Sequence, residues 1–146
     1  MSGITGWVKF NDDPQDLKRS ILTKMVDTLS RRGPDGRWLW VDEHVALGQA
    51  HLMLREDEDD KQPMHLHLNG QKWSIIFNGA LYNSNELREE LEREGVTFSS
   101  QTDTEVLVKA YWRWGTNCLS KLNGIFAFAI WNDREHTLRS EERRVG

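Results

Sequence analysis

Cysteine is almost absent from this chain, and so is any recognisable export segment. Cys118 is the single cysteine among the 146 residues, which excludes a disulfide within the chain. One cysteine fits a reducing cytosol, so we expect a cytoplasmic protein. The start has no basic segment followed by an apolar stretch, and we therefore predict no secretion signal.

Long hydrophobic runs and an excess of basic residues are missing as well. The longest apolar run, Ile125 to Trp131, is far too short to span a bilayer, so no membrane partner is predicted. There are 19 Lys and Arg against 23 Asp and Glu, which gives a net charge of -4. This balance argues against nucleic acid as an obligatory partner, because phosphate binding needs a basic face. The length favours one domain.

Strand-like and helix-like patterns alternate along the chain. Apolar residues at alternate positions predict a first strand, and four later apolar runs predict further strands; these lie at 4–10, 38–41, 45–54, 73–77 and 125–131. Asp13-Pro14 is typical of a helix start, with Asp13 as cap. The buried stripe of that helix is predicted to be Leu17, Ile21, Met25 (or Leu22) and Leu29. Two further helices are predicted, after Asn83 or Ser84 and from Asp103. Because strands outnumber helices, the sequence favours a layered α+β fold.

Four motifs occur in order along the chain. They are Met1-Ser2-Gly3-Ile4-Thr5-Gly6-Trp7, Arg31-Arg32-Gly33-Pro34-Asp35, Phe77-Asn78-Gly79-Ala80-Leu81-Tyr82-Asn83 and Thr102-Asp103-Thr104-Glu105. Together they resemble the glutaminase domain of glutamine-hydrolysing asparagine synthetases, a class II glutamine amidotransferase. The resemblance implies the N-terminal nucleophile hydrolase fold, a four-layer αββα sandwich of two antiparallel sheets. It also implies hydrolysis of glutamine to glutamate and ammonia, which a synthetase domain in the same chain uses for ATP-dependent asparagine synthesis.

Ser2 stands where this family has its nucleophilic cysteine. Removal of Met1 would leave an α-amino group that can act as general base for the side chain of the same residue. A hydroxyl is a much weaker nucleophile than a thiol at neutral pH, because almost none of it is ionised. Serine still serves other hydrolases of this fold, so Ser2 alone does not exclude catalysis. By resemblance, the Asn78 side chain and the Gly79 N–H form the oxyanion hole.

The glutamine pocket departs from the family at two positions. In the family, the arginine of a Leu-Gly-His-x-Arg-Leu segment holds the substrate carboxylate, and the matching stretch from Leu47 to Leu52 puts His51 there. A histidine cannot form the two-pronged guanidinium contact. Ala80 replaces the glutamate that binds the substrate ammonium, whereas Asp103 matches the second acidic partner. Asp103 is also read as a helix cap.

Ser2, His51 and Ala80 thus fall on one small site. We predict a degenerate glutaminase domain with weak or no activity on glutamine. The alternative is an active N-terminal serine amidohydrolase that takes another small amide. A third interpretation, that Ser2 is a mutation or read error for a natural cysteine, leaves His51 and Ala80 unexplained.

Cofactors and chain ends complete the predictions. No cofactor is expected in this domain, because ATP and Mg would belong to a synthetase domain that the sequence does not contain. His65 and His67 would share one face of a strand, but no cysteine or acidic partner has a familiar spacing, so no metal site is predicted. The domain is expected to cover residues 1–138 and to be truncated, with residues 139–146 as a charged, non-native tail. Formation of a homodimer is left open.

Overall fold

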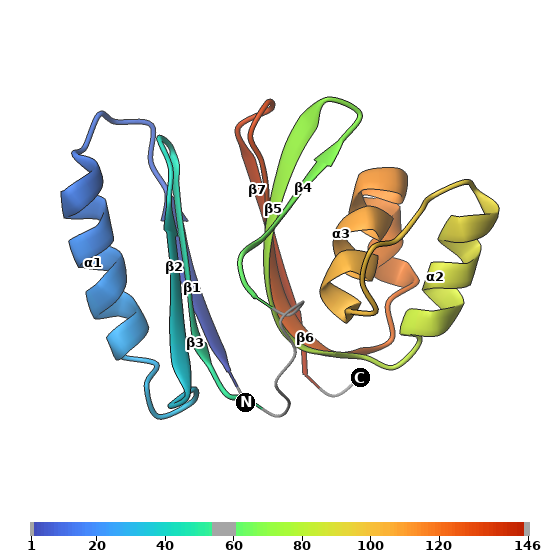
Figure 1. Cartoon of the computed structure of the whole chain (residues 1–146), viewed down its shortest axis with the longest axis horizontal. Helices are drawn as coiled ribbons and strands as arrows, with labels where there is room; N and C mark the ends of the chain where they lie inside the picture. The colour runs from blue at the N-terminus through green and yellow to red at the C-terminus, as the bar shows by residue number, and fades with distance from the viewer. Residues whose placement is uncertain (1, 54–60, 145–146) are drawn as a thin grey trace.

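The computed structural model describes residues 2–53 and 61–144, which form two antiparallel sheets packed face to face (Figure 1). The first sheet has the strand order β1-β3-β2, with β1 at Gly3–Val8, β2 at Gly36–Val41 and β3 at Val45–His51. The second has the order β4-β5-β6-β7, with β4 at Met64–Leu68, β5 at Gln71–Leu81, β6 at Gly124–Asn132 and β7 at Thr137–Arg143.

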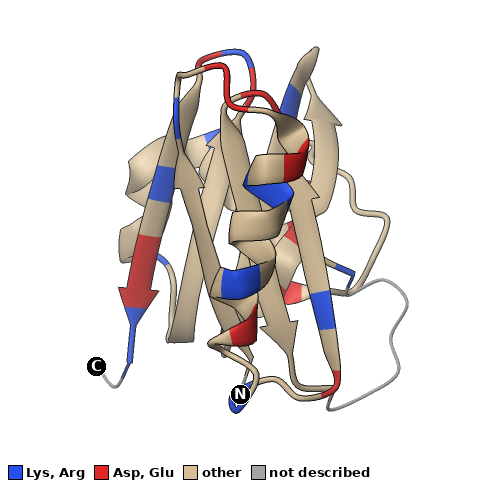
Figure 2. Cartoon of the chain, turned by 90° about the vertical axis from the view of Figure 1, so that its left-hand side faces the viewer, with Lys and Arg blue, Asp and Glu red and all other residues tan. Residues whose placement is uncertain are grey.

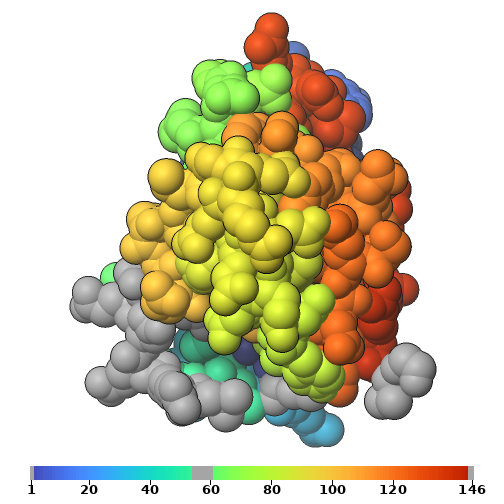
Figure 3. Space-filling model, turned by 90° about the vertical axis from the view of Figure 1, so that its right-hand side faces the viewer, coloured from blue at the N-terminus to red at the C-terminus, as the bar shows by residue number. Residues whose placement is uncertain are grey.

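Helices cover the outer face of each sheet. Helix α1 (Gln15–Asp27) lies on the first sheet, with basic and acidic side chains interspersed along it (Figure 2). Helices α2 (Ser84–Arg93) and α3 (Asp103–Trp114) and the 3-10 helix η2 (Gly115–Ser120) lie on the second (Figure 3). The predicted four-layer sandwich is confirmed. No helix in the described ranges is long and apolar enough to cross a membrane.

Strand alternation decides which side chains enter the space between the sheets. Leu47 of β3 packs against Ile76 of β5 in the buried cluster that joins the two sheets. Because successive side chains of a strand point to opposite faces, Gln49 and His51 share the inner face with Leu47. By the same rule Asn78 of β5 shares the inner face with Ile76. The polar ends of β3 and β5 therefore face each other.

Helix α1 packs through a stripe that shares with the predicted one Leu29 and Leu22, the predicted alternative to Met25, but not Leu17 or Ile21. Leu22 and Val26 are fully buried, whereas Leu17 and Ile21 are 48% and 43% exposed. A Cβ at Gly48 of β3 would lie 2.5 Å from Val26 Cγ2. The helix thus sits directly over this glycine, and the close approach turns Leu22 and Val26 toward the sheet.

The start of α1 also differs from the prediction. The residue at the cap is Pro14, and no side chain caps the helix. Asp13 instead forms an ion pair with Lys9, which directly follows β1. The Asp13 carboxylate, which was predicted to cap the helix, therefore binds a side chain four residues earlier in the sequence.

A buried carboxylate fixes the loop that leads into α3. Thr102 caps the helix by accepting from Glu105 N, so Asp103 does not have the cap role. The Glu105 carboxylate, 1% exposed, accepts from the N–H groups of Ser99 and Ser100 and from the Lys109 ammonium at 2.6 Å. Burial raises the pKa of Glu105, but these hydrogen bonds outweigh it and hold the pKa at about 2.

The second sheet extends beyond the predicted domain boundary. β7 pairs with β6 from Thr137 opposite Asn132 to Arg143 opposite Phe126, so residue 138 lies inside a strand. The Arg143 guanidinium donates to the carbonyls of Leu122 and Leu119 and lies 5.4 Å from the Phe126 ring centroid. Residues 139–143 are thus part of the sheet. The non-native origin of the tail stays a prediction.

We expect the free energy of unfolding to fall on acidification, because Glu105 is ionised in the folded state down to about pH 2. A folded-state pKa below the ordinary 4.5 stabilises the fold above pH 4.5 and loses that effect as the pH falls toward 2. The loss attributable to Glu105 is about 3 kcal/mol. Urea unfolding of the wild type and Glu105→Gln at several pH values checks this. Equal acid sensitivity of the two proteins would contradict it.

A chain that stops after Leu138 should be less stable than one that stops after Arg144. The shorter chain lacks the ladder of residues 139–143 and the Arg143 hydrogen bonds, a loss of roughly 2–4 kcal/mol. Thermal and urea unfolding of the two proteins measure the difference. Equal stability would mean that residues 139–143 add nothing to the stability of the domain.

Candidate functional site

Three segments of the chain converge on Ser2, which directly precedes β1. The Ser2 hydroxyl oxygen accepts from Leu52 N at 3.0 Å, just after β3. The Ser2 carbonyl accepts from Asn78 Nδ2 of β5 at 2.8 Å and from Arg32 Nε at 3.3 Å. Ser2 is 8% exposed. The predicted nucleophile is therefore held at the place where the ends of the two sheets meet.

The loop between α1 and β2 holds both Ser2 and the end of β3. Besides the Arg32 contact, Asp35 N donates to His51 O at 3.0 Å, and Met53 N donates to Asp35 Oδ2 at 2.7 Å. A Cβ at Gly33 would lie 2.2 Å from the carbonyl oxygen of Ala50, so only glycine allows this approach. The Arg32-Gly33-Pro34-Asp35 motif thus holds the end of β3 and Ser2 together.

Asn78 and Gly79, the predicted oxyanion donors, lie on β5 beside Ser2. The Asn78 amide carries two N–H donors, and one of them goes to the Ser2 carbonyl, which leaves the other for a ligand. Gly79 has φ +145°, and a Cβ there would lie 2.2 Å from the Ile125 carbonyl oxygen. The tight packing against β6 fixes the Gly79 backbone.

His51 is buried at the end of β3, with an unpartnered ring nitrogen. Its ring centroid lies 4.2 Å from that of Trp38 on β2, and the two rings are tilted by 42°. His51 is 8% exposed, and within residues 2–53 and 61–144 its Nδ1 has no hydrogen-bond partner. The position predicted to bind a carboxylate thus holds an imidazole packed against an indole.

Ala80 and Asp103 lie on the other side of the site. Ala80 is exposed on β5, on the same face as Asn78. The Asp103 carboxylate accepts from Leu81 N at 2.8 Å through Oδ2. The one retained acidic residue is therefore anchored next to Ala80, and Glu105 fixes the loop before it.

Gln49 is a buried residue of this region that the sequence reasoning left without a role. It is 2% exposed, and its Nε2 donates to Phe77 O across the two sheets at 3.1 Å. Its Oε1 has no partner among the described residues. The signal was present, because Gln49 lies two residues before His51 and alternation places both on one face.

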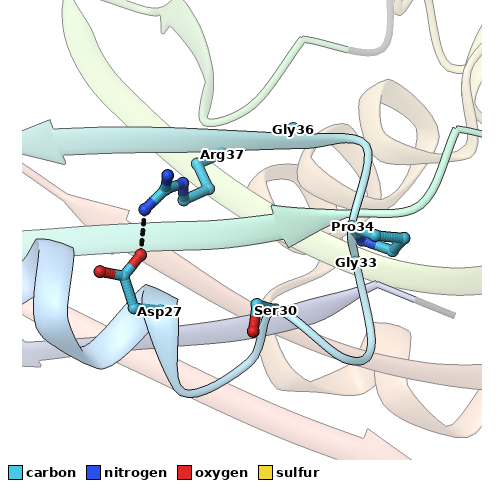
Figure 4. A pocket seen from close by; sticks show the side chains of 6 residues that line it. All are labelled: Asp27, Ser30, Gly33, Pro34, Gly36 and Arg37. Carbon is cyan, nitrogen blue, oxygen red and sulfur yellow. Dashed lines mark hydrogen bonds and ion pairs between the residues drawn. The ribbon is translucent and has the colours of Figure 1, made fainter.

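A surface hollow lies on the α1 side of the loop, apart from the predicted site residues. It is lined by Asp27, Ser30, Gly33, Pro34, Gly36 and Arg37 (Figure 4). An ion pair between Arg37 and Asp27 crosses it. None of the six residues is one that the sequence singled out for chemistry.

The single thiol cannot replace the missing nucleophile. Cys118 packs with Leu91, Val96 and Ala110 under α2 and α3, and burial raises its pKa to about 11. Its thiol therefore stays protonated at neutral pH. In the part of the chain that the structure describes, no three His, Cys, Asp or Glu residues form a group that could hold a metal ion.

Comparison with known proteins identifies the family of this chain. Residues 1–146 match the glutamine amidotransferase domain family. The chain is 42% identical over 146 residues to the glutamine-hydrolyzing asparagine synthetase 3 of Bacillus subtilis (strain 168). The match covers all of this chain and 24% of the synthetase, so the chain spans about a quarter of that relative's length.

Two solved structures are similar in fold. The allosteric regulatory enzyme of purine biosynthesis has a TM-score of 0.55 at 29% identity, covering 64% of this chain and 22% of its own. The glutamine phosphoribosylpyrophosphate amidotransferase of B. subtilis has a TM-score of 0.52 at 31% identity, covering 62% and 21%. Sequence match, identity and fold agree, and the chain belongs to the glutamine amidotransferase domain family, in the form found in glutamine-hydrolysing asparagine synthetases.

Proposed function

We propose that this chain is a degenerate glutaminase domain, with weak or no activity on glutamine. The observation that carries the proposal is the imidazole of His51, buried against Trp38 where the family has an arginine. A guanidinium binds a carboxylate through two parallel hydrogen bonds and a permanent charge. Losing such a contact in a buried pocket costs about 2–5 kcal/mol of binding.

Two further positions act in the same direction. The methyl group of Ala80 offers nothing to a substrate ammonium, which leaves Asp103 as the remaining acidic partner. One oxygen of Asp103 is already engaged with Leu81 N. The hydroxyl of Ser2 adds a slower chemical step, because almost none of it is ionised at neutral pH. Binding and chemistry are thus both weakened.

In a longer protein, the domain would brace a synthetase domain of the same chain. The B. subtilis relative has about three quarters of its length outside the match. Such a synthetase domain would bind ATP and Mg, and it would use free ammonia or an amine of its own substrate. We also expect a cytoplasmic location for this protein.

A second candidate is an active N-terminal serine amidohydrolase with another amide substrate. It is favoured by the geometry around Ser2. The hydroxyl is fixed by Leu52 N at 3.0 Å, and the Asn78 amide lies beside the same residue. A nucleophile and an oxyanion donor therefore remain together although the pocket for glutamine is altered.

Ammonia release from glutamine tests the first proposal. We expect a low rate from the wild type with Met1 removed, verified by mass, and little gain from Ser2→Cys. Adding His51→Arg and Ala80→Glu to Ser2→Cys should raise kcat/KM by about 100-fold or more over Ser2→Cys alone, because the carboxylate and ammonium contacts return. Brisk hydrolysis by Ser2→Cys alone would overturn the degenerate pocket. Release from other primary amides by the wild type would favour the second candidate.

A further inference from the structure

We propose that His51 is the proton acceptor for the Ser2 hydroxyl, so that the two residues form a serine–histidine pair. The inference rests on the second candidate function and deepens it. Relative to the family, Ser2 replaces a cysteine and His51 replaces an arginine, and the two replacements act together. The side chain at the position where the family binds the substrate carboxylate then takes part in catalysis.

The strand register places the two side chains next to each other. The antiparallel ladder of β1 and β3 ends where Gly3 pairs with Ala50, and its register continued by one residue sets Ser2 opposite His51. Side chains directly opposite each other in such a pair lie on one face, with Cβ atoms about 5 Å apart. The hydrogen bond from Leu52 N to Ser2 Oγ, 3.0 Å long, keeps Ser2 beside this end of β3.

Their unused hydrogen-bonding capacities are complementary. Ser2 Oγ accepts from Leu52 N, and among the described residues its own hydroxyl proton has no acceptor. His51 Nδ1 is buried and also lacks a partner among them. A hydroxyl donates one proton, and an imidazole that carries its proton on Nε2 accepts at Nδ1. A buried nitrogen without a hydrogen bond lowers the stability of the fold, so its presence here calls for a functional reason.

The surroundings hold His51 in place for this role. The Trp38 ring packs on the imidazole with a centroid distance of 4.2 Å. The His51 carbonyl accepts from Asp35 N at 3.0 Å, and Arg32 of the same loop reaches the Ser2 carbonyl. One loop therefore fixes both members of the pair, as a base and nucleophile that act together require.

The chemistry balances with these groups and water. Ser2 Oγ attacks the amide carbonyl carbon while its proton passes to His51 Nδ1, and the second Asn78 N–H stabilises the oxyanion. The C–N bond then breaks as His51 returns the proton to the leaving nitrogen, which leaves an ester on Ser2. Water, deprotonated by the same nitrogen, attacks the ester and releases the acid.

The same geometry defines the substrate class. With His51 used as a base, no cation remains at the place where the family binds a carboxylate. The Trp38 indole packs on His51 from β2, which flanks β3 on the side opposite β1. The pair therefore suits an amide whose acyl group carries no carboxylate, and glutamine is a poor fit.

This mechanism differs from the family's in one measurable respect. The α-amine of Ser2 acts as base only after Met1 is removed, whereas His51 acts whether or not that amine is free. A form of the protein with a blocked N-terminus therefore separates the two bases.

Covalent labelling of Ser2 by an alkyl fluorophosphonate tests the pair. Ser2 Oγ bonds to phosphorus, fluoride leaves, and the hydroxyl proton goes to the base. Mass spectrometry gives the labelling rate for the wild type, Ser2→Ala, His51→Gln, His51→Ala and a wild type that retains Met1. His67→Gln is the matched control, because His67 is exposed on β4. Thermal unfolding verifies that each variant is folded.

We expect labelling at Ser2, unchanged by His67→Gln and by retained Met1. His51→Gln and His51→Ala should slow it by about 100-fold or more. Added imidazole should restore part of the rate in His51→Ala, which a purely structural loss would not allow. Equal labelling of the wild type and His51→Gln, or labelling that needs a free α-amine, would overturn the pair but keep the second candidate. No labelling in any form would overturn both and leave the degenerate domain standing.

Discussion

The arrangement of the site depends on one close contact, in which Gly33 lies against the backbone of Ala50. No side chain fits there, since a Cβ would come within 2.2 Å of the Ala50 carbonyl oxygen. The contact brings the loop between α1 and β2 onto the end of β3, from where Arg32 reaches the Ser2 carbonyl and Asp35 binds the backbone on both sides of Leu52. The positions of Ser2 and His51 thus depend on this backbone contact, and Asn78 is linked to it through its hydrogen bond to the Ser2 carbonyl.

Much of the layered fold could be predicted, because alternation in strands follows from local sequence. The burial of α1 could be predicted only in part, since Leu17 and Ile21 have the same four-residue spacing as Leu22 and Val26, and the position of Gly48 on another strand selects the second pair. Strand β7 runs across the boundary predicted at residue 138 for a related reason. Charged residues after it resemble a tail, yet they pair with β6 through backbone groups that carry no sequence signal.

The site was predicted through resemblance, residue by residue, and the geometry adds how the departures are grouped. Ser2 and His51 lie at the joined ends of β1 and β3, whereas Ala80 lies on β5 near Asp103. His51 packs against the Trp38 ring of a neighbouring strand, and its Nδ1 has no partner among the residues that the structure describes. Since this contact is tertiary, no spacing within the Leu47 to Leu52 segment could have indicated it.

Strand β7 has a consequence for association. It is the last strand of the second sheet, so one row of its backbone groups has no strand beside it in the described sheet. Its sequence, Thr137-Leu138-Arg139-Ser140-Glu141-Glu142-Arg143, places charges on both faces. Another chain that added a strand here would have to bring its own side chains against these charges and desolvate them. The charged side chains of β7 thus disfavour edge-to-edge pairing at this strand.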